Sequence, residues 1–162
     1  MNASIGDSAA PRRYLVCAVA DLRLAIAIEQ VSRVIQAVEV SPLPGEHAAV
    51  SGFVNLRGDL VPVVDLRRRL GLPQRELGLS DQFVLVQRGV WRWFLIADGV
   101  VGVVELSEGR FVARDRAAAP ADCRAGELHF AEGVISVLDM SRLVSVEEAE
   151  QVRGTLAGIA VP

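Results

Sequence analysis

Gly52-Phe53-Val54-Asn55-Leu56-Arg57-Gly58-Asp59-Leu60-Val61-Pro62-Val63-Val64-Asp65-Leu66 is the stretch that decides the fold of this 162-residue chain. A plainer copy, Glu132-Gly133-Val134-Ile135-Ser136-Val137-Leu138-Asp139-Met140, follows near the other end. Each copy has a glycine, an apolar strand, an aspartate and a further apolar residue. The repetition predicts a duplicated scaffold in which the more elaborate first copy carries a recognition surface.

The repeat extends upstream of these two stretches. A strand-like segment that begins at Tyr14 recurs at Phe83, 69 residues later (83 − 14). From Asp65 to Asp139 the spacing is 74 (139 − 65), so the second copy is longer by five residues (74 − 69). We expect this insertion in the loop that contains Ala117-Ala118-Ala119-Pro120, because loops absorb extra residues at low cost. A period of about 70 residues fits two small packed domains.

The composition limits the classes of function. Hydrophobic residues make up 51% of the chain, which is enough for a real core. The net charge of −3 offers no basic field for nucleic acid or an anionic membrane surface. All 17 basic residues are arginines, which excludes P-loop, Schiff-base and protein-kinase chemistry, because each requires a lysine. No apolar run approaches the ~18–20 residues that span a bilayer. Protein partners are therefore expected.

Residue patterns for catalysis or metal binding are missing from the sequence. Cys17 and Cys123 lie outside any CxxC motif and are predicted to be reduced thiols of a cytoplasmic protein. The surroundings of His47 and His129 do not predict a metal site. We therefore expect no catalytic residues and no cofactor. A small β-rich enzyme is kept as a remote alternative, and a nucleic-acid-binding module as another.

Many short apolar segments separated by turn signals predict mostly β barrels or sandwiches. Leu22 to Glu29 alternates apolar and polar residues, which predicts a half-buried strand. Trp91 and Trp93 fall on one face of a later strand and are expected to fill the second core.

Short helices are predicted where each repeat ends. Asp65 and Asp139 follow apolar strands and are expected to cap these helices, because an aspartate at the N-cap accepts backbone N–H bonds. Ser145 and Glu148 form a capping-box pattern that predicts a C-terminal helix through about Arg153.

The chain resembles the CheW-like family of chemotaxis coupling proteins from Tyr14 to about Val146. The resemblance is carried by Asn55-Leu56-Arg57-Gly58, Val61-Pro62-Val63-Val64-Asp65-Leu66-Arg67 and Asp98-Gly99-Val100. It implies two pseudo-symmetric small five-stranded barrels packed on each other. The implied division is a disordered arm at 1–11, a first barrel at 12–72, a linker at 73–80, a second barrel at 81–146, and a C-terminal helix and tail at 147–162.

The same resemblance implies a non-enzymatic scaffold. Its expected partners are the regulatory domain of a CheA-type histidine kinase and the cytoplasmic hairpin of a chemoreceptor, which is expected in the groove between the barrels. The scaffold would be cytoplasmic and associated with membrane-bound receptor arrays. The implied receptor-binding residues are Val31, Gly52, Asn55, Arg57, Asp98, Gly99, Val100 and Val103. The implied kinase-binding residues are Ser32, Arg33, Val38 and Val40.

One position departs from the family pattern. Family members often have Val-x-Glu-Val or Val-x-Glu-Ile where this chain has Val31-Ser32-Arg33-Val34. A charge reversal at an interface costs several kcal/mol unless the partner has changed with it. Arg33 therefore indicates a dedicated kinase with an acidic site, a weakened kinase contact, or service in a specialised array with pilus motility or second-messenger output.

The residues by themselves leave several alternatives open. Arg57 is suited to binding carbonyls or carboxylates of a partner, or to capping carbonyls of its own turn. Gly52 and Gly58 fit either a close approach of a partner helix or a turn with positive φ. Val31, Val34, Val100 and Val103 fit core packing or the walls of an apolar groove. Arg67-Arg68-Arg69 is predicted to be a solvated helix face.

Overall fold

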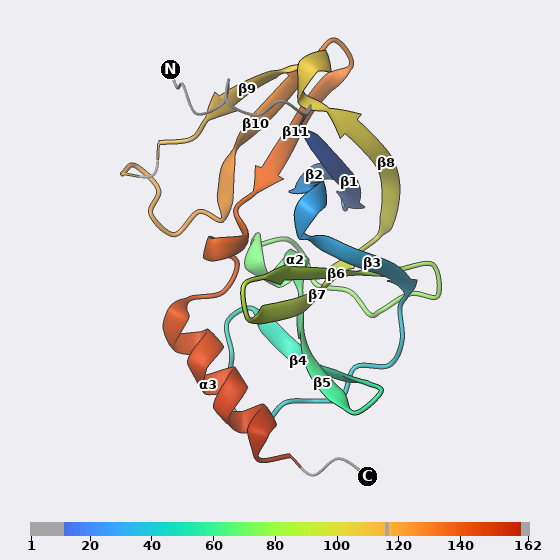
Figure 1. Cartoon of the computed structure of the whole chain (residues 1–162), viewed down its shortest axis with the longest axis vertical. Coiled ribbons are helices and arrows are strands. Elements are labelled where there is room, and N and C mark those ends of the chain that lie inside the picture. The colour runs from blue at the N-terminus through green and yellow to red at the C-terminus, as the bar shows by residue number, and fades with distance from the viewer. Residues whose placement is uncertain (1–11, 116, 160–162) are drawn as a thin grey trace.

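The computed structural model describes residues 12–115 and 117–159. This part of the chain forms two lobes, each built on its own β-sheet, and helix α3 (Val146–Ala157) lies alongside the lower lobe (Figure 1). The predicted arm at 1–11 and the end of the predicted tail at 160–162 lie outside the described residues.

The upper lobe contains a six-stranded sheet with the order β8-β1-β2-β11-β10-β9. Its strands are β1 (Arg13–Val19), β2 (Leu22–Ala27), β8 (Gly99–Glu105), β9 (Arg110–Ala113), β10 (Arg124–Phe130) and β11 (Gly133–Leu138). The lower lobe contains a five-stranded sheet with the order β3-β6-β7-β5-β4. Its strands are β3 (Val31–Gln36), β4 (Val50–Leu56), β5 (Asp59–Val64), β6 (Gln82–Arg88) and β7 (Trp91–Ala97). The prediction of a mostly β fold with two similar halves is confirmed.

The two sheets repeat the same pairing register. Tyr14 pairs with Ala27 and Phe83 with Ile96, so both partners differ by 69 residues (83 − 14 and 96 − 27). The parallel pair Ala25–Val137 likewise corresponds to Phe94–Val63 (94 − 25 and 137 − 63, the spacings 69 and 74). The repeat detected in the sequence is therefore a repeat of structure.

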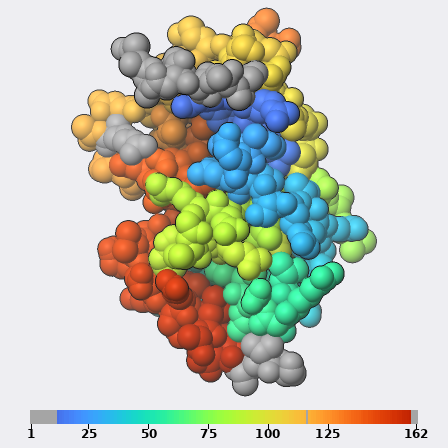
Figure 2. Space-filling view, viewed as in Figure 1, coloured from blue at the N-terminus to red at the C-terminus, as the bar shows by residue number. Residues whose placement is uncertain are grey.

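The repeats exchange strands, which the sequence does not reveal. Strands β1 and β2 of the first repeat pair into the sheet of β10 and β11, whereas β6 and β7 of the second repeat pair into the sheet of β4 and β5. Figure 2 shows this interleaving at the surface, where the blue segment lies between yellow and green segments. Each lobe thus combines both halves of the chain, and the division into barrels at 12–72 and 81–146 does not follow the two sheets.

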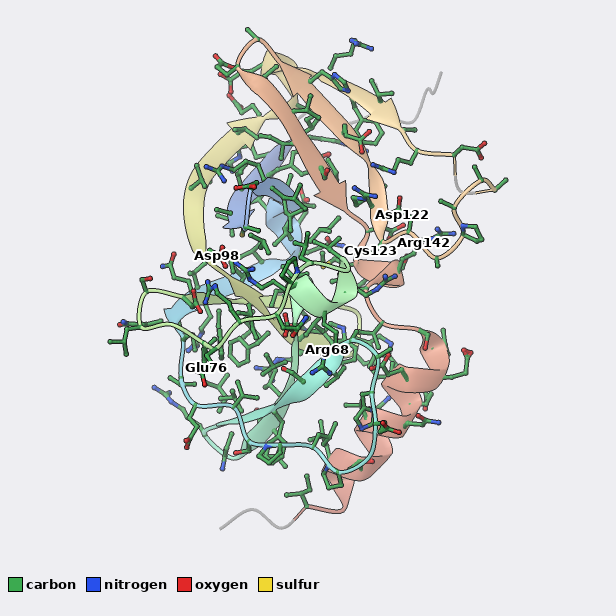
Figure 3. The ribbon with its side chains drawn as sticks, turned by 180° about the vertical axis from the view of Figure 1, so that it is seen from behind. Arg68, Glu76, Asp98, Asp122, Cys123 and Arg142 are labelled. Atoms are coloured by element: carbon green, nitrogen blue, oxygen red, sulfur yellow. The ribbon has the colours of Figure 1, made fainter. Side chains whose placement is uncertain are left out.

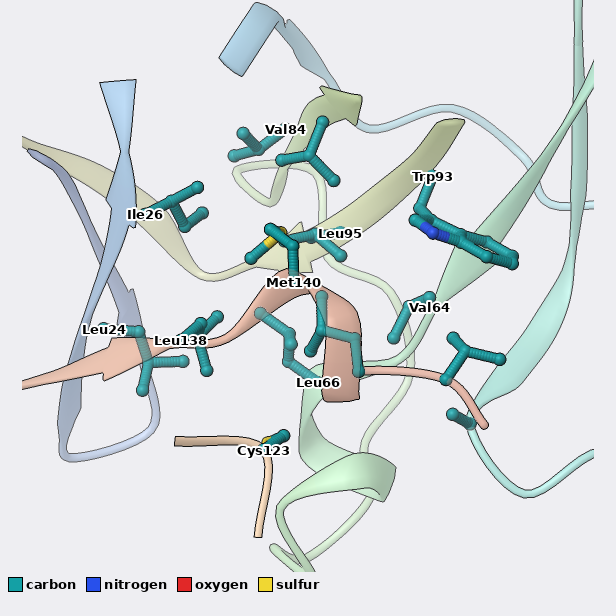
Figure 4. Close-up of a cluster of buried hydrophobic side chains, with 14 of the residues drawn as sticks. Leu24, Ile26, Val64, Leu66, Val84, Trp93, Leu95, Cys123, Leu138 and Met140 are labelled. Carbon is teal, nitrogen blue, oxygen red and sulfur yellow. The ribbon is translucent and has the colours of Figure 1, made fainter. Parts of the chain in front are cut away.

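Alternate residues of the strands enter different cores. In β6, Phe83 and Leu85 face the interior of the lower lobe, whereas Val84 and Val86 face a core shared by the two lobes. The shared core also contains Ile26, Leu66, Leu95, Leu138 and Met140 (Figure 4). The prediction of a half-buried strand at Leu22 to Glu29 is wrong, because Ala25 fills the interior of the upper lobe opposite Leu24 and Ile26. Strand β2 ends at Ala27, and Ile28–Gln30 forms the 3-10 helix η1.

The predicted helix caps are present. Asp65 accepts hydrogen bonds from the backbone N–H groups of Arg67 (3.0 Å) and Arg68 (3.3 Å) and begins α2 (Leu66–Arg69). Asp139 accepts from Ser141 N–H (3.0 Å) at the start of η3 (Met140–Arg142). A further 3-10 helix, η2 (Leu106–Glu108), connects β8 to β9.

Helix α3 is longer than predicted and is attached by a buried carboxylate. Ser145 caps it by accepting from Glu148 N–H (3.1 Å). The Glu148 side chain does not complete a capping box. It accepts instead from the backbone N–H groups of Ala49 (2.9 Å) and Val50 (3.2 Å) at the start of β4. Because Ala149 and Val152 are buried in the shared core, the helix continues past Arg153 to Ala157.

Candidate functional site

The tip of the β4–β5 hairpin presents Arg57 to solvent. Arg57 has φ +53° and Gly58 has φ +92°, as a type I′ turn requires. Asn55 Oδ1 accepts a hydrogen bond from Gly58 N–H (2.7 Å) and fixes the turn. Within residues 12–115 and 117–159, the Arg57 guanidinium has no hydrogen-bond or ion-pair partner, so it does not cap carbonyls of its own turn there. The hairpin is therefore a rigid mount for an outward-facing guanidinium.

Gly52 supports this hairpin from below. The glycine is buried, and a Cβ added to it would overlap the Ser41 carbonyl oxygen and the Val40 side chain. Ser41 and Phe53 exchange two backbone hydrogen bonds of 2.9 Å, so the segment after β3 lies directly against β4. The close approach at Gly52 is made by the chain's own backbone, whereas Gly58 has the positive φ of a turn.

The second group of predicted receptor-binding residues lies on β8, an edge strand of the six-stranded sheet. Gly99 pairs with Ala18, and Val100 pairs with Cys17. Val100 is half-buried against the shared core, and its N–H donates to Gln82 Oε1 (2.8 Å). Val103 is 52% exposed and lines a groove of about 590 Å³, whose lining also includes Val101 and Val134.

Asp98, which joins β7 to β8, is held by three donors. Its Oδ1 accepts from Arg75 Nη2 (2.8 Å), and its Oδ2 accepts from Arg67 Nη2 (2.8 Å) and from Ala20 N–H (2.8 Å). Arg75 also binds both oxygens of Asp81 (2.8 and 2.9 Å). Figure 3 shows Asp98 at the level where the lobes meet. We call Arg67, Arg75, Asp81 and Asp98 the linker clasp.

The linker clasp perturbs its own charges. The hydrogen bond from Arg75 lowers the pKa of Asp81, although burial opposes this change. The same bond raises the pKa of the Arg75 guanidinium. Asp81 is only 2% exposed, and its Oδ2 also accepts from Gly78 N–H (2.7 Å). The carboxylate is therefore a fixed negative charge that orients the linker.

Strand β3 carries the predicted kinase-binding residues and Val31. Ser32 and Arg33 are exposed on this edge strand, and Val38 just beyond it is 44% exposed. Val40 is half-buried and lines a cleft of about 380 Å³ together with Asp98. Val31 pairs with Val86 and packs against the shared core.

The predicted residues therefore occupy three places: the β4–β5 tip, the β3 edge, and β8 with its junction to β7. The space between the lobes is a packed core to which Val31, Val34 and Val100 contribute as half-buried residues. For these three valines the core interpretation is correct, whereas Val103 is exposed.

The arginine run in α2 was misjudged as a solvated face. Arg69 donates to the carbonyls of Leu143 (2.9 Å), Ala121 (2.7 Å) and Arg142 (2.9 Å), which belong to the second repeat. Arg67 binds Asp98, and Arg68 Nη1 donates to the His47 carbonyl (3.2 Å). Figure 3 places Arg68 in the region where the lobes meet, beside the labelled second-repeat residues Cys123 and Arg142. No local signal predicts these contacts, because the acceptors lie on distant loops.

Cys17 and Cys123 are free and buried, and burial raises the pKa of the Cys17 thiol to about 11. Among residues 12–115 and 117–159, no group of three His, Cys, Asp or Glu side chains is arranged to hold a metal ion. In the same part of the chain, no helix has the length and apolar character needed to cross a membrane.

Comparison with known proteins identifies the family. The sequence model of the CheW-like domain matches residues 13–148, so the chain belongs to the CheW-like family. It is 32% identical to the chemotaxis protein CheW of Thermotoga maritima over 87 residues, which is 54% of this chain and 57% of that protein. It is 30% identical to protein FrzA of Myxococcus xanthus over 101 residues, 62% of this chain and 63% of that protein. These two matches thus span less than two thirds of the relatives' lengths.

A longer match joins the chain to the chemotaxis protein CheW of Rhizobium meliloti, with 26% identity over 141 residues, 87% of this chain and 86% of that protein. The crystal structure of the scaffolding protein TtCheW from Thermoanaerobacter tengcongensis superposes with a TM-score of 0.74 and 22% identity, covering 88% of this chain and 93% of that one. This likeness establishes the fold.

Proposed function

We propose that this protein is a non-enzymatic adaptor that couples the cytoplasmic tip of a chemoreceptor to a CheA-type histidine kinase. The observation that carries the proposal is the rigid β4–β5 tip with its outward Arg57, within a chain that belongs to the CheW-like family. The adaptor would work in the cytoplasm at membrane-bound receptor arrays.

On the receptor side, the proposed direct contacts are Asn55 and Arg57 at the hairpin tip and Val103 on β8. A planar guanidinium on a fixed turn suits carbonyl or carboxylate groups at the end of a helical hairpin. An exposed valine in an apolar groove suits the apolar stripe of a helix. Val31, Gly52, Gly99 and Val100 would hold the contacting strands in place, since three of them are half-buried and Gly52 is buried.

On the kinase side, we propose the exposed face of β3 and the segment that follows it, with Ser32, Arg33, Val38 and Val40. The Arg33 side chain is exposed, so a kinase partner with an acidic residue opposite it would gain a charge-assisted contact. This feature also favours a second candidate, an adaptor of a specialised array with its own kinase. The 30% identity to protein FrzA fits that candidate, because this relative is not named as a CheW.

The test is binding of purified receptor-tip hairpin and kinase regulatory domain to the wild type, to Arg57→Ala and to Arg33→Glu. Arg57→Ala should weaken receptor binding and leave kinase binding intact, and Arg33→Glu should do the reverse. Arg88→Ala is the matched control, because Arg88 is an exposed arginine at the end of β6. Wild-type affinity of Arg57→Ala for the receptor tip would contradict the assignment.

A further inference from the structure

Asp98 was implied as a receptor contact, yet its carboxylate is already engaged inside the protein. Three donors approach it at 2.8 Å: Arg75 Nη2 at Oδ1, and Arg67 Nη2 and Ala20 N–H at Oδ2. A carboxylate has about four acceptor positions, so most of its capacity is used. Asp98 is 27% exposed and Arg67 is 16% exposed, so their ion pair is partly shielded from solvent.

The three donors belong to three different segments. Ala20, with φ +53°, lies in the β1–β2 turn of the upper lobe, Arg67 lies in α2, and Arg75 lies in the linker. Asp98 itself lies where the chain leaves the five-stranded sheet and enters β8 of the six-stranded sheet. Its N–H also donates to the Ala18 carbonyl (2.8 Å). One residue therefore ties both lobes and the linker together outside the apolar core.

Arg75 is prepared for this role before it meets Asp98. Its two terminal nitrogens form a fork with Asp81, and Asp81 is fixed in turn by Gly78 N–H. The planar guanidinium is thereby oriented, so little further side-chain freedom is lost when it also binds Asp98. Loss of Asp98 would leave Arg67 and Ala20 N–H without this acceptor and free the start of β8.

We propose that Asp98 is a positioning residue that acts through Arg67 and Arg75. It fixes the start of β8 against α2 and the linker, and so sets where Val103 lies relative to the Arg57 hairpin. The inference rests on the proposed receptor binding, and it assigns to Asp98 an indirect part in it.

A double-mutant cycle in receptor binding separates positioning from contact. The affinity of the receptor-tip hairpin is measured for the wild type, Asp98→Ala, Arg75→Ala and the double variant, well below their unfolding temperatures. Residues of one network couple by about 0.5–3 kcal/mol, so each single variant should bind roughly 5- to 30-fold more weakly. The double variant should bind about as weakly as the weaker single variant.

Independent contact predicts a different result. If Asp98 touches the receptor directly, Arg75→Ala binds like the wild type, and Asp98→Ala loses the same factor in either background. That outcome overturns the inference and leaves the proposed function standing, whereas a wild type that does not bind the tip overturns both. If the alanine variant of Asp98 does not fold, Asp98→Asn replaces it in the cycle, because the amide keeps one acceptor oxygen and loses the charge.

Arg69→Ala supplies the control for stability. Arg69 belongs to the same helix as Arg67, but its hydrogen bonds join α2 to the loops at Ala121 and Leu143 rather than to Asp98. This variant should lose thermal stability and keep receptor affinity. Equal weakening of receptor binding in Arg69→Ala would show a general effect of destabilisation and overturn the inference.

Discussion

Glu148→Ala tests how helix α3 is attached to the lower lobe. The Glu148 carboxylate is 9% exposed and accepts from Ala49 N–H at 2.9 Å and Val50 N–H at 3.2 Å. Both donors belong to buried residues, so the substitution leaves two buried N–H groups without this acceptor. An unsatisfied buried donor costs about 1–3 kcal/mol, so we expect a loss of roughly 2–4 kcal/mol of unfolding free energy.

The assay is urea unfolding followed by tryptophan fluorescence, which reports on Trp91 and Trp93 near the helix. Glu148→Gln keeps an acceptor oxygen and should lose only about 1 kcal/mol. Glu150→Ala is the matched control, because Glu150 is exposed on the same helix, and it should stay within about 0.5 kcal/mol of the wild type. The reasoning is refuted if Glu148→Ala is as stable as Glu150→Ala.

Three further predictions concern the sites described above. Gly52→Ala should lower the unfolding free energy by about 1–3 kcal/mol, because the added methyl group overlaps a backbone carbonyl; an unchanged midpoint in thermal unfolding would contradict this. Val31→Asp should lower the melting temperature, because Val31 packs on the shared core, whereas Val103→Asp at an exposed site should weaken receptor binding with little change in melting temperature. The lowered pKa of Asp81 contributes stability above the ordinary carboxyl pKa, and this contribution is lost as the pH falls through the lower, folded-state pKa; Arg75→Ala should therefore flatten the acid limb of a stability-against-pH curve, and an unaltered limb would count against the pair.

The features that the sequence predicted correctly are those that local patterns specify. The spacing of 69 residues identified structurally equivalent strands, and Asp65 and Asp139 were recognised as helix caps because a cap depends on its own helix only. The turn at Gly58 was likewise indicated by a glycine in a hairpin.

The features that the sequence did not predict depend on distant segments. Equivalent strands of two repeats have the same pattern whether they pair within their own repeat or exchange, so the position of β1 and β2 in the sheet of β10 and β11 was not foreseen. The partners of Arg69 are backbone carbonyls, which carry no sequence signature. Arg57 was expected either to bind a partner or to cap its own turn, and only its geometry favours the first interpretation.

The most direct measurement is size-exclusion chromatography of a mixture of receptor-tip hairpin, kinase regulatory domain and this protein. The account predicts one complex that contains all three components, no joint elution of receptor and kinase fragments when the protein is omitted, and loss of the receptor fragment alone with Arg57→Ala. Separate elution of the fragments in the presence of the wild-type protein would contradict its role as an adaptor.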